Sequence, residues 1–239
     1  MDYYSKYLKY KKKYIDLKLS SDVNQINLIG GNGENSKPIV EQIEEATHLI
    51  KDIANIVDGY IDKVDKIFSN DDAFAALFKS GRVVTWGNDD YGGDSSSVQS
   101  ELKNQVVKHI YSTDTAFAAV LESGRVVTWG NAKYGGNIRS RRVRNKLEDQ
   151  VVQHIYSNRG AFAAVLASGR VMTWGDARYG GDSSGVQSEL KDQVVQHIYS
   201  TNYAFAAVLA SGRVVTWGDA SCGGDSRWVI DKDGYFNGI

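Results

Sequence analysis

The sequence is poor in the residues that mark several common classes of protein. It has 239 residues but a single Cys, Cys222, so no disulfide can form within the chain and a secreted fold held by disulfides is not expected. It has one Pro, Pro38, beside 24 Gly, which favours many tight turns over a disordered Pro-rich chain. There is no run of about 18 apolar residues for a membrane span, and residues 1–14 lack the apolar core of a secretory signal. These absences predict a protein that is not secreted, has no membrane span and resides in a reducing compartment.

The net charge is also low, at -1, but it is unevenly distributed. Residues 1–20 contain six Lys and two Asp, so they carry +4 while the remaining 219 residues carry -5. This asymmetry predicts that the N-terminal segment and the rest of the chain have different roles.

Repetition is the feature that the chain has in abundance. The octapeptide "SGRVVTWG" occurs at 80–87, 123–130 and 211–218, and "SGRVMTWG" occurs at 168–175. Their Trp residues are 43, 45 and 43 positions apart, a period typical of propeller blades and of some helical arrays. Alignment on the octapeptide gives four units, at 62–104, 105–149, 150–192 and 193–236.

The residues of each unit favour strands over helices. Segments such as "QVVQHIYS" and "AFAAVLAS" are short and rich in β-branched and aromatic residues, and "RVVTW" alternates between apolar and polar residues. A Ser-Gly pair joins the last two segments in a hairpin, where Gly124, Gly169 and Gly212 can adopt a positive φ. The sequence therefore predicts a mainly β fold in residues 61–239, built as four tandem repeats of about 43 residues.

The segment "AFAAVL" is apolar on both of its faces, with Phe117 and Leu121 on one and Ala118 and Val120 on the other. Strands that are buried on both sides belong to sheets packed between other sheets. One large Trp in each unit is expected to fill the space between successive blades as the structural core of the repeat. These residues are Trp86, Trp129, Trp174 and Trp217.

The stretches "GRVVTWGNDDYGGDSS" at 81–96 and "VVKHIYSTDTAFAAVLESG" at 106–124 resemble the repeat of the regulator of chromosome condensation family. The resemblance implies a β-propeller. The chain departs from the family in having "YGGD" or "CGGD" where Gly-Gln-Leu-Gly is usual, shorter units, and four units where classical members have seven. A closed ring of four blades, an open arc and a ring completed by a second chain all remain open.

Two helices are predicted before the repeats. Residues 38–60 begin at Pro38 and place Ile39, Ile43, Ala46 and Ile50 on one apolar stripe, which predicts an amphipathic helix that caps the end of the array or packs on a partner helix. Residues 1–20 predict a basic amphipathic helix, and residues 21–37 a polar glycine linker. The first helix carries a tyrosine stripe and lysines elsewhere, namely Tyr3, Tyr7, Tyr10, Tyr14, Lys6, Lys9, Lys12 and Lys13.

The opening "YYSKYLKYKKKYIDLK", followed by "NLIGGN", resembles a segment shared by many proteins of mimivirus-type giant DNA viruses, several of them packaged in the particle. The resemblance implies a sorting or docking helix. A solvated helix with a core-facing Tyr stripe and a contact with an anionic membrane or nucleic acid are the other interpretations. The expected location is accordingly the virion or the cytoplasm of the infected cell.

The repeats offer no candidate catalytic centre, metal site or cofactor motif. His109, His154 and His197 occupy one equivalent position, where the first unit has Lys66, which favours packing over metal binding. Cys222 replaces a Tyr of the other units in a variable loop, so a catalytic thiol is not expected there. The chain is therefore predicted to have no enzymatic activity and to need no cofactor.

One unit contains a basic cluster that the others lack. Residues 137–149, "NIRSRRVRNKLED", replace sequences such as "DSSGVQSELKD" and bring a candidate contact for an anionic partner, namely Arg139, Arg141, Arg142, Arg144 and Lys146. A merely solvated loop is the alternative; the partner would be an acidic protein surface or nucleic-acid phosphates. The sequence as a whole thus predicts a non-catalytic interaction or structural module of a giant virus, able to self-associate. The alternative is a regulator of a small GTPase or a chromatin binder, as the family resemblance implies.

Overall fold

The structure is a computed structural model that describes residues 62–137 and 150–228, together with the single positions Glu44, His48, Asp231, Asp233 and Tyr235. The chain divides into two compact units, Met1–Ile61 and Asp62–Ile239. The predicted helix 1–20 and linker 21–37 lie outside the described residues. Of the predicted capping helix 38–60, only Glu44 and His48 are described, and both are helical and exposed.

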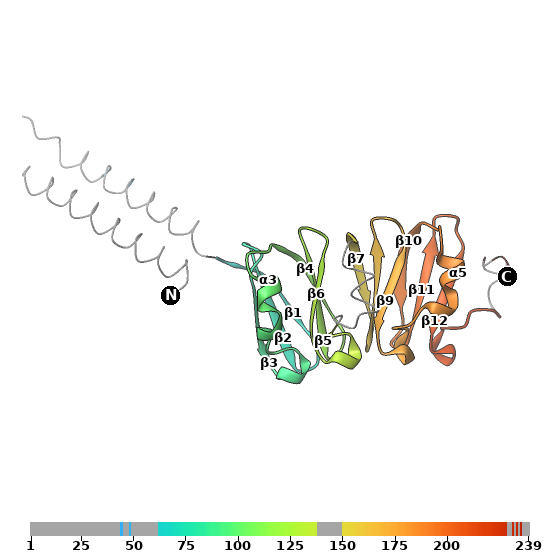
Figure 1. Ribbon diagram of the computed structural model, residues 1–239, viewed down its shortest axis with the longest axis horizontal. Helices are drawn as coiled ribbons and strands as arrows, with labels where there is room; N and C mark the ends of the chain where they lie inside the picture. The colour runs from blue at the N-terminus through green and yellow to red at the C-terminus, as the bar shows by residue number, and fades with distance from the viewer. Residues whose placement is uncertain are drawn as a thin grey trace, which may run out of the picture. The chain divides into compact units, whose positions relative to one another are not determined.

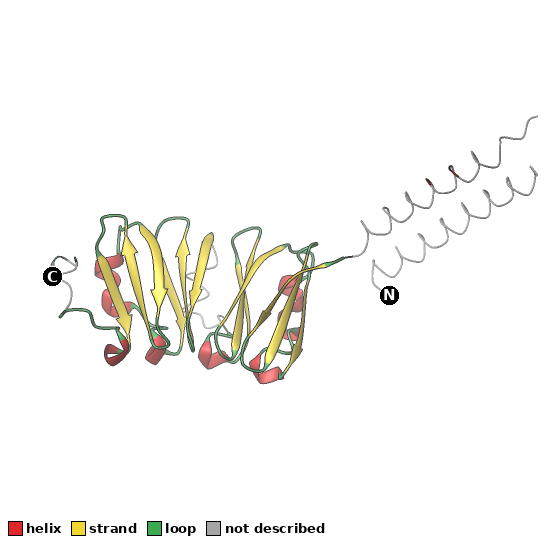
Figure 2. Cartoon of the chain, turned by 180° about the vertical axis from the view of Figure 1, so that it is seen from behind, coloured by secondary structure: helices red, strands yellow, loops and turns green. Residues whose placement is uncertain are grey.

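The described residues form four antiparallel sheets of three strands, each in the order first, second, third strand (Figures 1 and 2). Sheet 1 comprises β1 (Val64–Ser69), β2 (Ala73–Phe78) and β3 (Val83–Gly87), and sheet 2 comprises β4 (Val107–Ser112), β5 (Ala116–Leu121) and β6 (Val126–Gly130). Sheet 3 comprises β7 (Val152–Ser157), β8 (Ala161–Leu166) and β9 (Val171–Gly175), and sheet 4 comprises β10 (Val195–Ser200), β11 (Ala204–Leu209) and β12 (Val214–Gly218). The prediction of a mainly β fold of four tandem repeats, like a β-propeller, is confirmed.

Short helices follow the third strand of each sheet. The three residues before each Gly-Gly pair form the 3-10 helices η1 (Asp89–Tyr91), η3 (Ala132–Tyr134), η4 (Ala177–Tyr179) and η6 (Ala220–Cys222). The polar tails of the first and third units form η2 (Ser96–Val98) with α3 (Gln99–Leu102), and η5 (Ser184–Val186) with α5 (Gln187–Leu190). Buried Leu102 and Leu190 anchor the two α-helical turns, so these tails cover apolar surface.

The first strand of every sheet carries a β-bulge. In sheet 2 the register shifts between Val107, which pairs with Leu121, and His109, which pairs with Val120. Because of the extra residue, Val107 and Ile110 are both buried in the same core cluster although they are three positions apart. The bulge thereby explains why "VVKHIYS" does not alternate strictly in sequence.

The hairpin between the second and third strands is longer than the predicted Ser-Gly pair. In sheet 2 the strands end at Leu121 and resume at Val126; the Gly124 N–H donates to the Leu121 carbonyl at 2.9 Å and the Leu121 N–H to the Arg125 carbonyl at 2.9 Å. Gly124 has a φ of 80°, as predicted. This is the pattern of a tight turn followed by a left-handed glycine bulge, which draws Glu122 and Arg125 into the connection.

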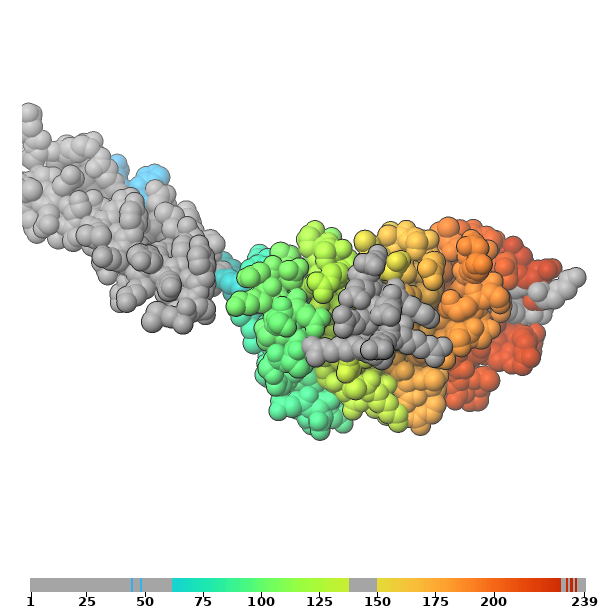
Figure 3. Space-filling model, in the orientation of Figure 1, coloured from blue at the N-terminus to red at the C-terminus, as the bar shows by residue number. Residues whose placement is uncertain are grey.

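The sheets pack face to face, and their first strands contact one another in the sequence β1, β4, β7, β10. Figure 3 shows the four sheets as adjacent bands running from green to red. At each junction a face of small residues meets a face of large ones: Ala73 and Ala75 of sheet 1 share a core with Phe117 and Trp129 of sheet 2. The same arrangement recurs between sheets 2 and 3 and between sheets 3 and 4.

The four predicted core tryptophans differ in their environment. Trp129, Trp174 and Trp217 are buried between sheets, whereas Trp86 is 44% exposed. Trp86 departs from the expectation because it lies on the face of sheet 1 that faces away from sheet 2, and no other described sheet packs against that face.

Candidate binding surface

The loops that join the first and second strands meet at one edge of the array. They line a concave surface with a cavity volume of about 380 Å³, formed by residues 69–71, 112–114, 157–159 and 200–202. We call these residues the link-loop surface. All of them are polar. The first strand of each sheet, which we call the inner strand, ends in a Ser, and the loop that follows it, which we call the link, begins with Asn or Thr. The four loops meet because the first and second strands pair in the same register in every sheet, and because the sheets are stacked with their first strands side by side.

The first residue of each link is a structural cap. The Asn70 side chain accepts a hydrogen bond from the Ala73 N–H at 2.8 Å and donates to the Tyr91 carbonyl at 2.7 Å. Asn158 and Thr201 make the equivalent pairs of bonds in sheets 3 and 4. Side chains of this kind commonly stabilise turns in this way. The links are therefore held in a fixed conformation by residues whose role is common to the units.

The second residue of each link varies, and hydrogen bonds connect these residues across sheets 1, 2 and 3. The second residues are Asp71, Asp114, Arg159 and Asn202. The Asp71 N–H donates to the Asp114 carbonyl at 3.2 Å, and the Asp114 N–H to the Arg159 carbonyl at 3.0 Å. The Arg159 guanidinium donates to the Asp114 carboxylate at 2.7 Å, and this hydrogen bond holds the pKa of Arg159 above its usual value. An ordered scaffold thus presents two carboxylates, a guanidinium and an amide from the four units.

A row of His and Tyr side chains follows the inner strands. The Tyr111 hydroxyl is 3.3 Å from His154 Nδ1, and the Tyr156 hydroxyl is 3.2 Å from His197 Nδ1. Burial, followed by the charges of Lys66 and His154, lowers the pKa of His109, and burial, followed by the charge of His197, lowers that of His154. Within residues 62–137 and 150–228 no group of three His, Cys, Asp or Glu side chains could hold a metal ion. The ring contacts along the row are those of side chains packed between sheets.

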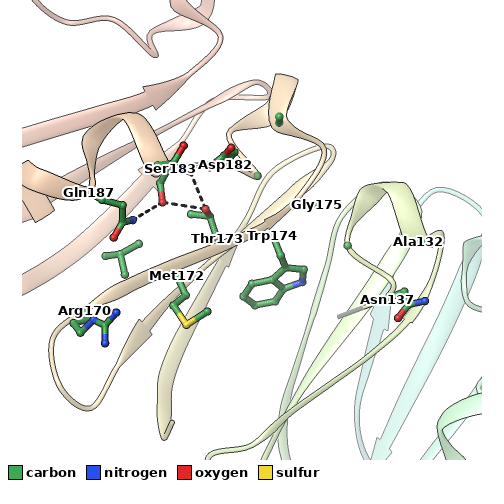
Figure 4. Close-up of a pocket in the computed structure, with 15 residues that line it drawn as sticks. Ala132, Asn137, Arg170, Met172, Thr173, Trp174, Gly175, Asp182, Ser183 and Gln187 are labelled. Carbon is green, nitrogen blue, oxygen red and sulfur yellow. Dashed lines mark hydrogen bonds between the residues drawn. The ribbon is translucent and has the colours of Figure 1, made fainter. Parts of the chain in front are cut away.

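A second cavity, of about 430 Å³, lies along β9 (Figure 4). Its polar side chains are bonded to one another: Thr173 donates to the Ser183 hydroxyl at 3.1 Å, and Gln187 donates to the same oxygen at 2.8 Å. In sheets 2 and 4 the equivalent strands β6 and β12 are contacted by η2 and η5. In the second unit the residues that correspond in sequence to η2 and η5 are 138–149, which lie outside the described residues, so the cavity is not taken as a candidate site.

The other sequence-predicted site residues also lie outside the described residues. These are the basic cluster Arg139, Arg141, Arg142, Arg144 and Lys146, and the helix residues Tyr3, Tyr7, Tyr10, Tyr14, Lys6, Lys9, Lys12 and Lys13. The links at 113–115, 158–160 and 201–203 visibly differ in sequence from unit to unit, whereas the caps that order them were not predicted. The signal was an Asn or Thr three residues before each "AF" pair, at 70, 113, 158 and 201. Among the helices that the structure describes, none is long and apolar enough to cross a membrane.

Comparisons with known proteins give structural similarity without a sequence family. No family model matches the sequence, and no curated protein matches it. One similar solved structure is that of Prp20p from Saccharomyces cerevisiae, which is 17% identical with a TM-score of 0.49, covering 77% of this chain and 51% of that chain. Human WBSCR16 is 18% identical with a TM-score of 0.45, covering 70% of this chain and 51% of that chain.

The entire ectodomain of the receptor kinase CR4 from Physcomitrella patens is 19% identical with a TM-score of 0.47, covering 66% of this chain and 42% of that chain. The chain thus spans about half or less of the length of these solved structures.

Proposed function

We propose that this protein is a non-catalytic interaction module that binds a partner protein through the link-loop surface. The observation that supports the proposal is a concave polar surface to which each of four similar units contributes one variable side chain, on a framework of Ser and cap residues common to the units. Loops on a rigid scaffold are the usual place for binding residues. A repeat that supplies one loop per unit can specify a partner by the combination of side chains.

The chemistry of the surface favours a hydrogen-bonding, partly basic segment of a partner. The surface contains the carboxylates of Asp71 and Asp114, the guanidinium of Arg159 and the amide of Asn202. The ion pair between Arg159 and Asp114 restrains both side chains, so less rotamer freedom is lost when a partner binds. Asp71 and Asn202 are the groups that we expect to contact the partner first, since they flank this ion pair along the row.

Affinity capture with the full chain tests the proposal. The bait proteins are the natural chain, an Asp71→Ala, Asn202→Ala variant, and a control variant, Glu122→Ala, Ser123→Ala, in a hairpin turn between β5 and β6. The proposal predicts that a partner retained by the natural chain and by the control is lost from the link-loop variant. Equal retention by all three baits would contradict it.

A second candidate function is the regulation of a small GTPase or binding to chromatin, which rests on the resemblance of the repeats to the regulator of chromosome condensation family. Prp20p from Saccharomyces cerevisiae binds Gsp1p and histones. The test is the rate of nucleotide release from a small GTPase with and without the protein. An unchanged rate would remove the exchange function and leave the interaction module.

We propose that the protein resides in the particle of a giant DNA virus or in the cytoplasm of the infected cell. In either place the module would have a structural or docking role. This setting rests on the Tyr-Lys segment of residues 1–20 alone. Peptides from the repeats in purified particles would support packaging. Their presence only in extracts of infected cells would contradict packaging and keep the cytoplasmic location.

A further inference from the structure

The three junctions between sheets are built from the same two faces. One sheet offers small side chains, such as Ala116 and Ala118 of sheet 2, and the next sheet offers large ones, such as Phe162 and Trp174 of sheet 3. Every sheet carries both kinds of face, because successive residues of a strand point to opposite sides. The direction of the array is therefore defined: the large face of each sheet meets the small face of the sheet before it.

The two ends of the array carry the two faces against which no other described sheet packs. Sheet 1 presents a large face in which Phe74 is 43% and Trp86 44% exposed, with Ile67 and Val84 also exposed. We call these four residues the head face. Sheet 4 presents a small face at the opposite end, which we call the tail face: Ala204, Ala206, Val208 and Val214. Ala206 and Val208 are partly exposed, whereas Ala204 and Val214 are buried. Figure 1 shows sheets 1 and 4 at the two ends of the row.

The space over the tail face has the form that an aromatic pair needs. At internal junctions a glycine makes room for that pair: a Cβ on Gly92 would lie 2.8 Å from the Phe117 ring, and one on Gly180 2.8 Å from the Phe205 ring. Gly223 is the equivalent residue of sheet 4, and within residues 62–137 and 150–228 a Cβ there would meet only the Thr201 methyl group, at 3.9 Å. Gly223 thus leaves a space of the kind that Phe and Trp fill elsewhere.

Hydrogen bonds at the internal junctions identify a donor for this space. The indole N–H of Trp129 donates to the Gly92 carbonyl at 3.1 Å, and that of Trp217 to the Gly180 carbonyl at 3.0 Å. The half-exposed Trp86 carries the equivalent donor on the head face, and the Gly223 carbonyl is the equivalent acceptor at the tail. In a continued array these two groups would pair.

The inner strands repeat this complementarity. The Tyr111 and Tyr156 hydroxyls reach the imidazole of the following sheet, but Tyr199 of sheet 4 is 60% exposed. At the head, the position of that imidazole is occupied by Lys66, whose side chain is exposed. A lysine ammonium can donate to a tyrosine hydroxyl, so this pair would also be matched across a junction between chains.

We propose that the head face docks on the tail face of a second copy of this chain. The occupant is a second copy because each end offers what the other end needs: the apolar surface and the glycine space of all three internal junctions, and the indole hydrogen bond that two of them contain. Such a contact is heterologous: it closes into a ring when the rotation allows and otherwise extends into a longer row. The proposal concerns a surface separate from the link-loop surface and stands independently of the proposed function.

The test is the mass of the full chain in solution, measured by light scattering and sedimentation over a wide range of concentration. A single chain has a mass of 26.4 kDa. We expect two chains if the ring closes at two copies, or a mass that increases with concentration if the row extends. A mass of one chain at every concentration would overturn the proposal.

Two variants then determine which faces meet. Phe74→Arg blocks the head face and Ala206→Arg blocks the tail face; each is expected to weaken self-association by at least about 100-fold, because the contact would bury an unpaired guanidinium. Mixing the two variants should restore pairs of chains that grow no further, since one intact head then meets one intact tail. Self-association of either variant alone, or no pairing in the mixture, would overturn the head-to-tail contact.

The controls separate docking from folding. Ser123→Arg introduces the same charge in an exposed hairpin turn and should leave the mass unchanged. Urea unfolding of each variant checks that the sheets are intact, and Val208→Lys replaces Ala206→Arg as the tail block if the latter fails to fold. Loss of association in the Ser123→Arg control as well would contradict a specific contact between head and tail.

Discussion

Sheets 1 and 2 contain the same aromatic pair in the same register but in different surroundings. Phe74 stacks on Trp86 with ring centroids 5.3 Å apart, and Phe117 stacks on Trp129 at 5.4 Å. The first pair is 43% and 44% exposed, whereas the second is 0% and 1% exposed. The unit therefore supplies the stack, and the preceding sheet supplies its burial.

This difference separates two contributions to stability that are usually mixed. In repeat arrays, stability is approximately the sum of a term for each unit and a term for each interface between neighbours. Equivalent substitutions in sheets 1 and 2 remove the same contacts within the unit, but only those in sheet 2 remove contacts across a junction. Pairs of matched variants can thus measure the interface term directly.

The largest expected effect is that of truncating the stacked Phe. Phe117→Ala should lower the free energy of unfolding by about 3–5 kcal/mol, because it leaves a cavity between two sheets. Phe74→Ala should cost roughly 1 kcal/mol, since the side chain is already half exposed. Urea unfolding of both variants measures the difference, with Ala206→Arg as the common background so that chains stay separate. Equal losses would show that the junction contributes little.

The next effect concerns two equivalent glycines: Gly92, which lies against the aromatic pair of the next sheet, and Gly223, which has no following sheet among the described residues. Gly92 and Gly223 have positive φ values of 93° and 98°, so Ala is strained at either position by roughly 1–2 kcal/mol. Only Gly92→Ala also forces a Cβ against the Phe117 and Trp129 rings, which should add about 1–3 kcal/mol.

The measurement is again urea unfolding of the two variants, in the same background of separate chains. A Gly223→Ala variant as destabilised as Gly92→Ala would contradict an open space over the tail face. A Gly92→Ala variant destabilised only by the strain of its positive φ, and so no more than Gly223→Ala, would show that sheets 1 and 2 can move apart without cost.

A smaller effect distinguishes two buried tryptophans that look alike in sequence. Trp129 donates to the Gly92 carbonyl, whereas the Trp174 indole N–H has no hydrogen-bond partner among the described residues. Trp129→Phe should therefore cost about 1 kcal/mol more than Trp174→Phe, because only the first loses a hydrogen bond and the second removes an unsatisfied buried donor. Thermal or urea unfolding of the two variants tests this order, and the reverse order would contradict the assigned bond.

The repeat and its strands could be predicted from the sequence because the signals are local. The alternation in "RVVTW", the two apolar faces of "AFAAVL" and the glycine of the hairpin each depend on a few neighbouring residues. The length of the turn could not be predicted as well, because Glu122 and Arg125 are compatible with either strand or turn. The helical turns in the polar tails were also missed, although Val98 and Leu102 are four residues apart and both are buried.

The environment of each unit could not be predicted from its own residues. Trp86 and Trp129 occur in identical octapeptides, and only their position in the array decides which is buried. The same limit applies to the candidate surface: the variable links were evident in sequence, but their convergence on one cavity depends on the stacking of four sheets. The caps at Asn70, Asn158 and Thr201 could not be predicted either, because the backbone carbonyls to which they donate follow the third strand, 21 residues along the chain.

The smallest expected effect is a pH dependence of the free energy of unfolding. It arises from histidines in the first strands of sheets 2 and 3, which sheet 1 lacks. Burial lowers the pKa of His109 and His154 below the ordinary value of 6.5, whereas sheet 1 has Lys66 at this position. The unfolded chain therefore binds protons that the folded chain does not. The contribution of these neutral imidazoles to the free energy of unfolding is fully present above pH 6.5. It is lost as the pH falls through the lowered pKa values of the folded state. Both side chains are partly exposed, so solvent screens the effect.

The free energy of unfolding, measured in urea between neutral and mildly acidic pH, should thus fall less steeply in a His109→Gln, His154→Gln variant than in the natural chain. Nuclear magnetic resonance titration of the imidazole protons provides the direct measurement, with apparent pKa values below the ordinary one as the expected result. An unchanged slope in the variant would contradict the contribution of these two residues. Since the head face contains neither His, the mass of the assembly should be insensitive to the double substitution, which separates protonation of the inner strands from contact between chains.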